Sequence, residues 1–267
     1  MLKTAQLTFG ILAACFLLLP IMAILPLAFT GGIFLTYPIE SYSLRWFREL
    51  ATTAQWSNSI VNSMIIGSGA TVLSVVLGTL AALGLRGAGI PLPNLVRTVF
   101  LLPMVVPAVV LGVGLQIALA RIGLASSYVG VIFSHTVLCV PFVIVSVSTA
   151  LQGINPAVER AAASLGAGPV TVFRRVTMPL AMPGMVTGAV FAFATSLDEV
   201  VLTLFVAGPG QRTLARQMFS SIRENISPAV AAAALVLIVG TLALAVLADI
   251  LRRRQARTTA APPENEA

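Results

Sequence analysis

Long apolar segments separated by short polar connections dominate the pattern of residues along this chain. Each of six segments has the roughly 20 predominantly apolar residues that an α-helix needs to cross the hydrocarbon of a bilayer. They cover residues 7–29, 60–85, 99–120, 128–151, 183–205 and 228–250. The pattern predicts an all-α integral membrane protein with six transmembrane helices. The first segment follows Lys3 as in a signal peptide, but it is longer than a typical signal core, so we expect a retained helix.

The composition strengthens this prediction. Of the 267 residues, 58% are hydrophobic and only 9% are charged, whereas an average soluble domain carries about 25% charged residues. The mean hydropathy is +0.99. In a membrane protein, a net charge of +7 indicates arginines that fix topology. We therefore expect no nucleic-acid partner.

Residues suited to catalysis or cofactor binding are scarce. Lys3 is the sole lysine and no glycine-rich turn precedes it, so the chain lacks a phosphate-binding loop for ATP. One histidine and two widely separated cysteines are too few for a typical zinc site. We expect Cys15 and Cys139 to be small buried apolar residues. The residues thus predict no cofactor and no enzymatic activity on this chain.

Basic residues predict the orientation. With the N-terminus inside, ten basic residues lie on the cytoplasmic side and six outside, and Arg252–Arg254 directly follow the last span. Both termini should therefore be cytoplasmic. The connection 30–59 should be external and the 152–182 loop cytoplasmic. We expect a transmembrane domain over 1–257, with its core at about 55–251, and a disordered cytoplasmic tail at 258–267.

Small and helix-breaking residues interrupt the spans. Gly184 and Gly188 form a Gly-x-x-x-Gly pair, which lets two helices approach closely. Pro103, Pro107 and Pro141 should bend their helices, with neighbours satisfying the freed carbonyls.

The 152–182 loop carries the most informative pattern. Asn155 and Pro156 are typical of a helix start, the alanines that follow favour a helix, and Gly166 can end it in a left-handed conformation. A second short helix through Phe173 should carry Arg174 and Arg175. Two short helices separated by a glycine would form a compact projection that fits a groove on another protein.

The run from Glu159 to Ala167, continued by Val176-Thr177-Met178-Pro179, resembles the EAA loop of permease subunits of binding-protein-dependent (MetI-like) ABC importers. In that family Ala-Ala is followed after three residues by Gly, and nine residues later by Ile-x-Leu-Pro. Arg160 stands in the slot of the usual glutamate. The resemblance implies that the loop couples to an ATPase; the matching residues are Glu159, Arg160, Ala161, Ala162, Gly166, Phe173, Arg174 and Pro179.

Further segments are similar to the spermidine/putrescine branch of this family. They are Ser43–Phe47, Asn62-Ser63, Leu102-Pro103, Pro107, Gly112, His135, Pro141-Phe142, Ser196–Val201, Phe205, Gly208–Gly210, Thr213-Leu214 and Ile226–Pro228. Ala215 replaces the proline that often follows the Thr-Leu pair.

The resemblance implies a multi-pass protein of the bacterial inner membrane that works with several partners. These would be a second permease subunit in a heterodimer, two ATP-binding subunits that carry the ATP and Mg²⁺, and an external substrate-binding protein. The expected substrate is a polyamine or a related amine, and the alternative is another small solute.

Asp198 and Glu199 are adjacent carboxylates in the fifth apolar segment. They lie about 15 residues from its cytoplasmic start, or about 22 Å of helical rise. Carboxylates there cost roughly 2.5 to 3.5 kcal/mol each on insertion scales unless paired or hydrated. Two interpretations stay open: one carboxylate lines the path of a cationic substrate, or one pairs with Arg212 or Arg216 and shapes an outer gate.

Two other classes of protein are alternatives to an ABC permease subunit. An intramembrane serine protease could use Ser68 and His135, which need hydrogen-bond contact, but that interpretation leaves the 152–182 loop unexplained. A secondary transporter acting alone would use paired broken helices near the midplane. Here the membrane acids are confined to the fifth segment and to Asp249 at the end of the sixth.

Overall fold

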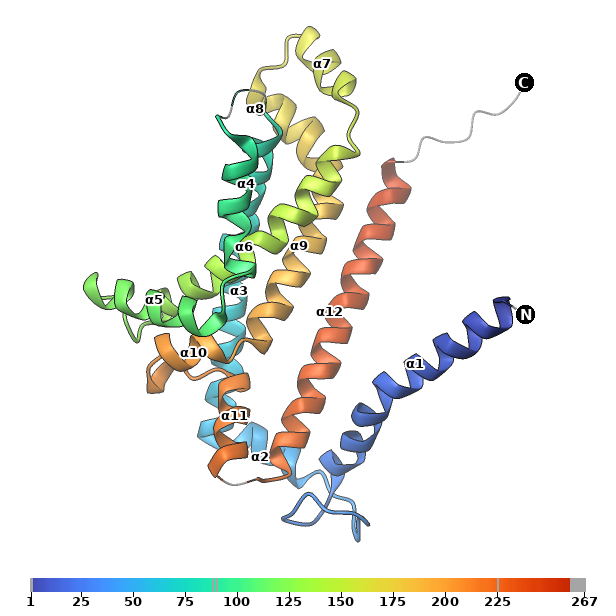
Figure 1. Ribbon diagram of the computed structural model, residues 1–267, viewed down its shortest axis with the longest axis vertical. Helices are drawn as coiled ribbons and strands as arrows, with labels where there is room; N and C mark the ends of the chain where they lie inside the picture. The colour runs from blue at the N-terminus through green and yellow to red at the C-terminus, as the bar shows by residue number, and fades with distance from the viewer. Residues whose placement is uncertain (1, 88, 90, 225, 260–267) are drawn as a thin grey trace.

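The computed structural model describes residues 2–87, 89, 91–224 and 226–259, and the regular secondary structure of this part of the chain is helical, with one isolated bridge between Thr30 and Tyr42. Figure 1 shows the arrangement of the helices. Their bounds are α1 Leu2–Ile24, α2 Arg45–Thr52, α3 Ala54–Arg86, α4 Pro93–Leu101, α5 Ala108–Arg121, α6 Tyr128–Gln152, α7 Pro156–Ser164, α8 Pro169–Val172, α9 Met178–Asp198, α10 Val201–Val206, α11 Leu214–Glu224 and α12 Ala229–Thr259.

Several helices are long and apolar enough to cross a membrane, which confirms the predicted fold class. Five such segments occur in the described chain: Lys3–Phe29, Ala54–Arg86, Tyr128–Gln152, Pro169–Asp198 and Ala229–Ile250. A sixth exists if the bent pair α4–α5 is counted as one span.

The third apolar segment differs from the single helix predicted over 99–120. α4 tightens into a 3₁₀ turn at Leu102–Met104, and the chain bends by 97° before α5 begins at Ala108. Pro103 and Pro107 lack the N–H groups that would continue an α-helix, and Pro107 takes an extended ψ of 131°. As a result α5 projects sideways from the bundle in Figure 1 and packs on α10.

The fifth apolar segment also differs from the prediction. α9 ends at Asp198, Glu199 is extended (ψ 112°), and α10 begins at Val201. One helix over 183–205 is therefore wrong, and the two carboxylates do not share a helix.

The centre of the molecule is the packing of α3, α6 and α9 on one another. The Gly184/Gly188 pair lies at the α6–α9 contact, as predicted. A Cβ built on Gly184 would lie 2.5 Å from the Ala150 Cβ and 2.8 Å from the Ser146 carbonyl oxygen. A Cβ on Gly188 would lie 3.0 Å from the Val143 Cα. Only glycine permits this approach of the two backbones.

α1 stands apart from the bundle in Figure 1, and its apolar side chains are mostly exposed. Cys15 on this helix is exposed, so its predicted burial is wrong. The apolar pattern placed α1 in a membrane, but a helix that faces lipid buries little against its own chain. Cys139 on α6 is buried, as predicted.

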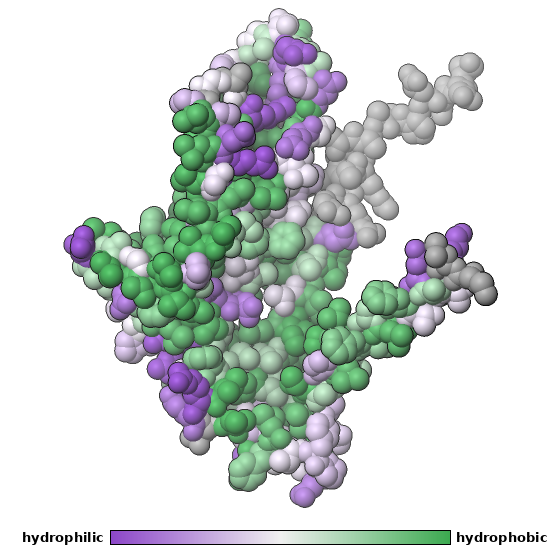
Figure 2. Space-filling model, in the orientation of Figure 1, coloured by the Kyte–Doolittle hydropathy of each residue, from purple (hydrophilic) through white to green (hydrophobic). Residues whose placement is uncertain are grey.

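The two ends of the molecule carry different elements. α7 and α8 lie at one end and α2 and α11 at the other (Figure 1). In Figure 2 hydrophilic side chains gather at the α7–α8 end, and apolar side chains cover most of the middle. α12 continues to Thr259, and the rest of the predicted tail, 260–267, lies outside the described residues.

The α6–α9 contact predicts an unequal effect of one substitution at two glycines. Gly184→Ala should destabilise the protein by about 1 to 3 kcal/mol, because the new methyl group overpacks backbone that cannot move aside. Gly240→Ala on α12 is the matched control, since a Cβ there meets nothing within 4 Å. Thermal unfolding of the purified protein in detergent should show a lower Tm for Gly184→Ala alone; equal Tm values would contradict the packing argument.

Candidate functional site

The first half of the 152–182 loop folds as predicted. The Asn155 side chain accepts a hydrogen bond from the Ala157 N–H (2.9 Å), and Pro156 begins α7. Gly166 follows the helix with a φ of +86°, a conformation that disfavours side chains. The Gly166 N–H bonds to the Ala163 carbonyl and the Ala167 N–H to the Ala162 carbonyl, which is a Schellman motif. Both ends of α7 are therefore fixed by local bonds.

The second half of the loop differs from the separate short helix predicted through Phe173. α8 runs directly into a π-helical turn, Phe173–Thr177, and then into α9. Pro179 directly follows the π turn, inside the continuous helix that α8, this turn and α9 form. The loop is thus one short helix followed by the start of a long one. A wider π turn inside an otherwise α-helical segment often marks a functional site.

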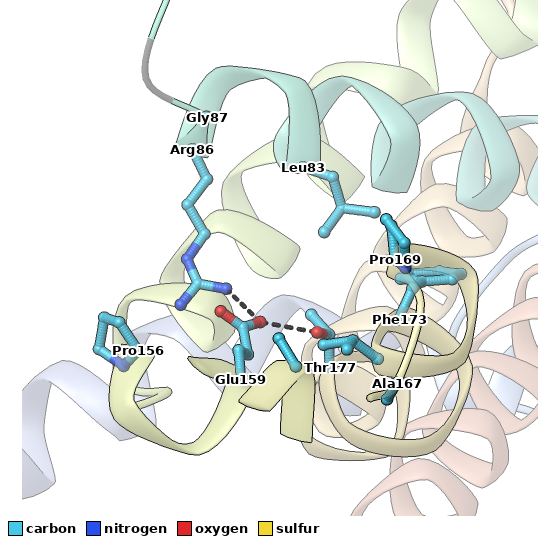
Figure 3. Close-up of a pocket in the computed structure, with 11 residues that line it drawn as sticks. Leu83, Arg86, Gly87, Pro156, Glu159, Ala167, Pro169, Phe173 and Thr177 are labelled. Atoms are coloured by element: carbon cyan, nitrogen blue, oxygen red, sulfur yellow. Dashed lines mark hydrogen bonds and ion pairs between the residues drawn. The ribbon is translucent and has the colours of Figure 1, made fainter. Parts of the chain in front are cut away.

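A cluster around Glu159 ties α7 to the bundle (Figure 3). Arg86, the last residue of α3, donates from Nη1 to the Glu159 Oε1 at 2.9 Å and from Nη2 to the Ile154 carbonyl at 3.3 Å. The Thr177 hydroxyl donates to the same Glu159 oxygen at 2.6 Å. The side chains of Arg86 and Glu159 are 27% and 23% exposed. This Glu159 cluster joins α3, α7 and the π turn.

The Glu159 cluster forms part of the wall of a groove. Its volume is about 780 Å³, and Leu83, Pro156, Ala163 and Phe173 contribute to its lining (Figure 3). Phe173 is half-buried, whereas Arg160, Arg174 and Pro179 are exposed. Of the loop residues that match the EAA motif, Phe173 therefore packs into the groove, whereas Arg160, Arg174 and Pro179 face outward.

The two membrane carboxylates have different surroundings. The Glu199 carboxylate accepts a hydrogen bond from the Leu202 N–H (2.7 Å), so it caps the first turn of α10. Asp198 is exposed, and both carboxylates line a groove of about 510 Å³ between α9 and α12. The arginines named as alternative partners bond elsewhere: Arg212 to the Gln217 side chain and Arg216 to the Thr203 and Ala207 carbonyls. No ion pair joins them to Asp198 or Glu199 in the described residues.

His135 is a fully buried packing residue. Its Nδ1 lies 2.7 Å from the Ser196 Oγ and its Nε2 lies 3.2 Å from the Thr203 Oγ1, so both ring nitrogens are occupied. These bonds connect α6, α9 and α10. Ser68 is exposed and does not contact His135, so the pairing that a serine protease needs is missing between these two residues.

Segments that resembled the polyamine branch meet at the end opposite α7. The Asn62 side chain donates to the Gly210 and Arg212 carbonyls (3.0 and 2.9 Å) and accepts from the Tyr128 hydroxyl (2.7 Å). The Ser63 hydroxyl accepts from the Leu214 N–H (2.8 Å). These contacts bind the connection after α10 to α3 and α6.

Sequence reasoning did not predict the roles of Arg86 and Thr177. Arg86 served only as a topology marker, and it lies 73 residues from Glu159 along the chain. One signal in the sequence was available. Arg86 ends a span on the same predicted side of the membrane as Glu159, the single acidic residue of the loop.

These features define a polytopic membrane protein with a helical projection at one end, the architecture of a transport permease. The chain matches the family described as "Binding-protein-dependent transport system inner membrane component" over residues 74–257. It belongs to this family of ABC importer permease subunits, which are multi-pass proteins of the bacterial inner membrane.

Relatives with different substrates are similar to this chain. The spermidine/putrescine transport system permease protein PotC of Haemophilus influenzae is 29% identical over 215 residues, which cover 80% of this chain and 84% of the relative. The molybdenum transport system permease protein ModB of Mycobacterium tuberculosis is 35% identical over 243 residues, covering 84% and 92%. The putrescine transport system permease protein PotI of Escherichia coli is 30% identical over 236 residues, covering 84% and 82%.

Solved structures share the fold. A permease chain of a bacterial ABC transporter that imports alginate matches 95% of this chain and 95% of its own length, with a TM-score of 0.73 and 18% identity. A chain of the inward-facing MetNI methionine ABC transporter matches 78% of this chain and 97% of its own, with a TM-score of 0.61 and 19% identity.

The Glu159 cluster predicts that Arg86→Gln loosens α7. The pair is partly exposed, so its loss should cost at most about 1 kcal/mol, and amide exchange in α7 should accelerate up to about fivefold. Hydrogen exchange measured by mass spectrometry checks this. Arg97→Gln, at an exposed arginine of α4, is the control. The double reversal Arg86→Glu/Glu159→Arg should restore protection, and unchanged exchange in Arg86→Gln would show that the pair does not hold α7.

Proposed function

We propose that this chain is the transmembrane subunit of an ATP-driven importer for a small solute, and that its 152–182 loop docks a separate ATP-binding subunit. The observation that carries this proposal is the construction of α7. It is capped by Asn155, ended by Gly166 and tied to α3 by the Arg86–Glu159 pair. A helix fixed in this way moves together with the bundle, so a displacement of α7 by a partner reaches the spans.

The proposed assembly places the α7 end in the cytoplasm and the α2–α11 end outside. A second permease subunit would complete the path, two ATP-binding subunits would hold ATP and Mg²⁺, and an external binding protein would deliver the solute. The related alginate transporter was solved with a substrate-bound periplasmic protein. ATP and the loaded binding protein must stabilise the same conformation, since otherwise neither shifts the equilibrium.

For the substrate we propose a polyamine. Relatives PotC and PotI are named for spermidine and putrescine. Asp198 supports a cation, because its carboxylate is exposed in the groove between α9 and α12 and makes no hydrogen bond or ion pair in the described residues. Glu199 would have a structural part, since its carboxylate already caps α10.

An oxyanion is the second candidate substrate. The observation in its favour is the 35% identity to ModB, a molybdenum transport permease. An exposed carboxylate beside the path would repel such an anion, which makes Asp198 the residue that separates the two candidates.

Docking predicts that Gly166→Val impairs binding of the ATP-binding subunit and its stimulated hydrolysis. Valine at a φ of +86° is strained by about 1 to 2 kcal/mol, so the end of α7 should rearrange. Gly166→Asn is the control, because asparagine tolerates the left-handed conformation. Co-purification and ATPase rates of the assembled transporter check this; normal values for Gly166→Val would refute docking through α7.

If the substrate is a cation, Asp198→Asn should lower putrescine uptake while ATP hydrolysis remains coupled to transport. The loss should be several-fold, since one attractive charge at a partly hydrated site contributes about 1 kcal/mol. Uptake of radiolabelled putrescine and of molybdate into proteoliposomes checks this.

Two variants control the uptake experiment. Glu224→Gln removes an exposed carboxylate at the end of α11 and should transport normally. Glu199→Gln keeps the acceptor that caps α10 and removes the other charge of the groove, so it should lower uptake less than Asp198→Asn. Unchanged putrescine uptake in Asp198→Asn would remove the cation-attracting role, and molybdate uptake would assign the oxyanion.

A further inference from the structure

The outward face of α7 consists of small residues around one cation. Residues Ala157, Arg160, Ala161 and Ser164 are spaced three and four apart, so they share one face of the helix, and all are exposed. Val158 (47% exposed) and Leu165 (89% exposed) flank this face. The adjoining face carries Pro156, Glu159 and Ala163, which line the groove beside the end of α3. Arg160 is thus the one long polar side chain on a flat, small-residue surface.

The charges of the loop leave this surface without a free anion. Between residues 152 and 182 the sequence contains one acid, Glu159, and three arginines, Arg160, Arg174 and Arg175. The Glu159 carboxylate is engaged by Arg86 and Thr177 (Figure 3). The three arginines are exposed. A partner that covers the outward face of α7 therefore meets a net positive charge.

We propose that the ATP-binding subunit receives α7 in an apolar groove that carries a carboxylate opposite Arg160. This inference rests on the proposed function, because it assumes that the partner at α7 is that subunit. Covering Arg160 without an anion would strand a buried charge, which costs several kcal/mol. A guanidinium and a carboxylate form two parallel hydrogen bonds. Alanines at 157 and 161 and serine at 164 let the groove approach the helix closely enough for that bond to form.

The pairing also determines which ATP-binding subunit the chain accepts. Arg160 stands where the EAA motif has glutamate, so the contact has the opposite charge. A groove built for glutamate would place a cation against Arg160, and like charges in an interface disfavour the wrong partner. The groove around Val158 and Leu165 would stay apolar, whereas the charge opposite Arg160 is reversed.

A zero-length cross-link tests this pairing in the assembled transporter. Arg160→Lys keeps the positive charge and introduces an amine that a carbodiimide joins directly to a contacting carboxylate. Lys3 is the only other lysine of the chain, so peptides linked through residue 160 are easily recognised by mass spectrometry. The expected product joins residue 160 to an Asp or Glu of the ATP-binding subunit. Absence of that product in a complex that co-purifies would overturn the proposal.

Charge reversal gives the second measurement. Arg160→Glu should weaken binding of the ATP-binding subunit about tenfold or more, with Arg160→Ala intermediate and Arg160→Lys close to wild type. Reversing the cross-linked carboxylate to Lys should restore binding of Arg160→Glu. Arg223→Glu is the matched control, because Arg223 is exposed on α11 at the opposite end. Both measurements are made in nanodiscs of neutral lipid and again with anionic lipid.

The outcomes separate this inference from the proposed function. If the wild-type chain binds the subunit and Arg160→Glu binds equally well, the carboxylate pairing is wrong while docking stands. If Arg160→Glu weakens binding only with anionic lipid, Arg160 contacts headgroups and the pairing is again wrong. If the wild-type chain does not bind the subunit at all, the proposed function fails as well.

Discussion

The close contact between α6 and α9 determines where the functional elements of this permease lie. Gly184 and Gly188 let the backbone of α9 approach the backbone of α6 at Val143 and Ser146. The 152–182 loop begins where α6 ends and finishes where α9 starts, so this contact holds the two ends of the loop at one place. The far end of α9 carries Asp198. A single helix pair therefore connects the loop at one end of the molecule to the carboxylate at the far end of α9.

The polar contacts of His135 inside the bundle are uncharged, whereas the contact at the α7 end is a charged pair. The reason is the free-energy cost of placing a charge in lipid. Inside the bundle, α6, α9 and α10 are joined through the uncharged hydroxyls of Ser196 and Thr203 and the ring of His135. At the α7 end, the charged pair Arg86–Glu159 keeps partial contact with solvent. A charge pair fully buried in the membrane would pay a large desolvation cost. The loop can therefore use a charged pair. Because the strength of this pair depends on the distance between its two side chains, it suits an element that a partner displaces.

The sequence predicted where the helices lie along the chain better than where they bend or end. The apolar segments located the helices, and Asn155, Pro156 and Gly166 predicted both ends of α7, because capping and left-handed termination depend on neighbouring residues. Pro103 and Pro107 predicted a bend in the third apolar segment, but neither the 97° break between α4 and α5 nor the end of α9 at Asp198 was predicted. A proline or a carboxylate in an apolar run permits a break, but packing against neighbouring helices decides whether the chain turns there.

The sequence alone was enough to predict a helical integral membrane protein whose 152–182 loop projects from the bundle. These properties depend on local composition and periodicity. The tertiary structure alone decided the partners of the charged residues. It brought Arg86 to Glu159 across 73 positions, directed Arg216 to backbone carbonyls and Glu199 to the start of α10, and left Asp198 and Arg160 exposed. Distances between residues far apart in the chain follow from how the helices pack, and no local pattern records that packing.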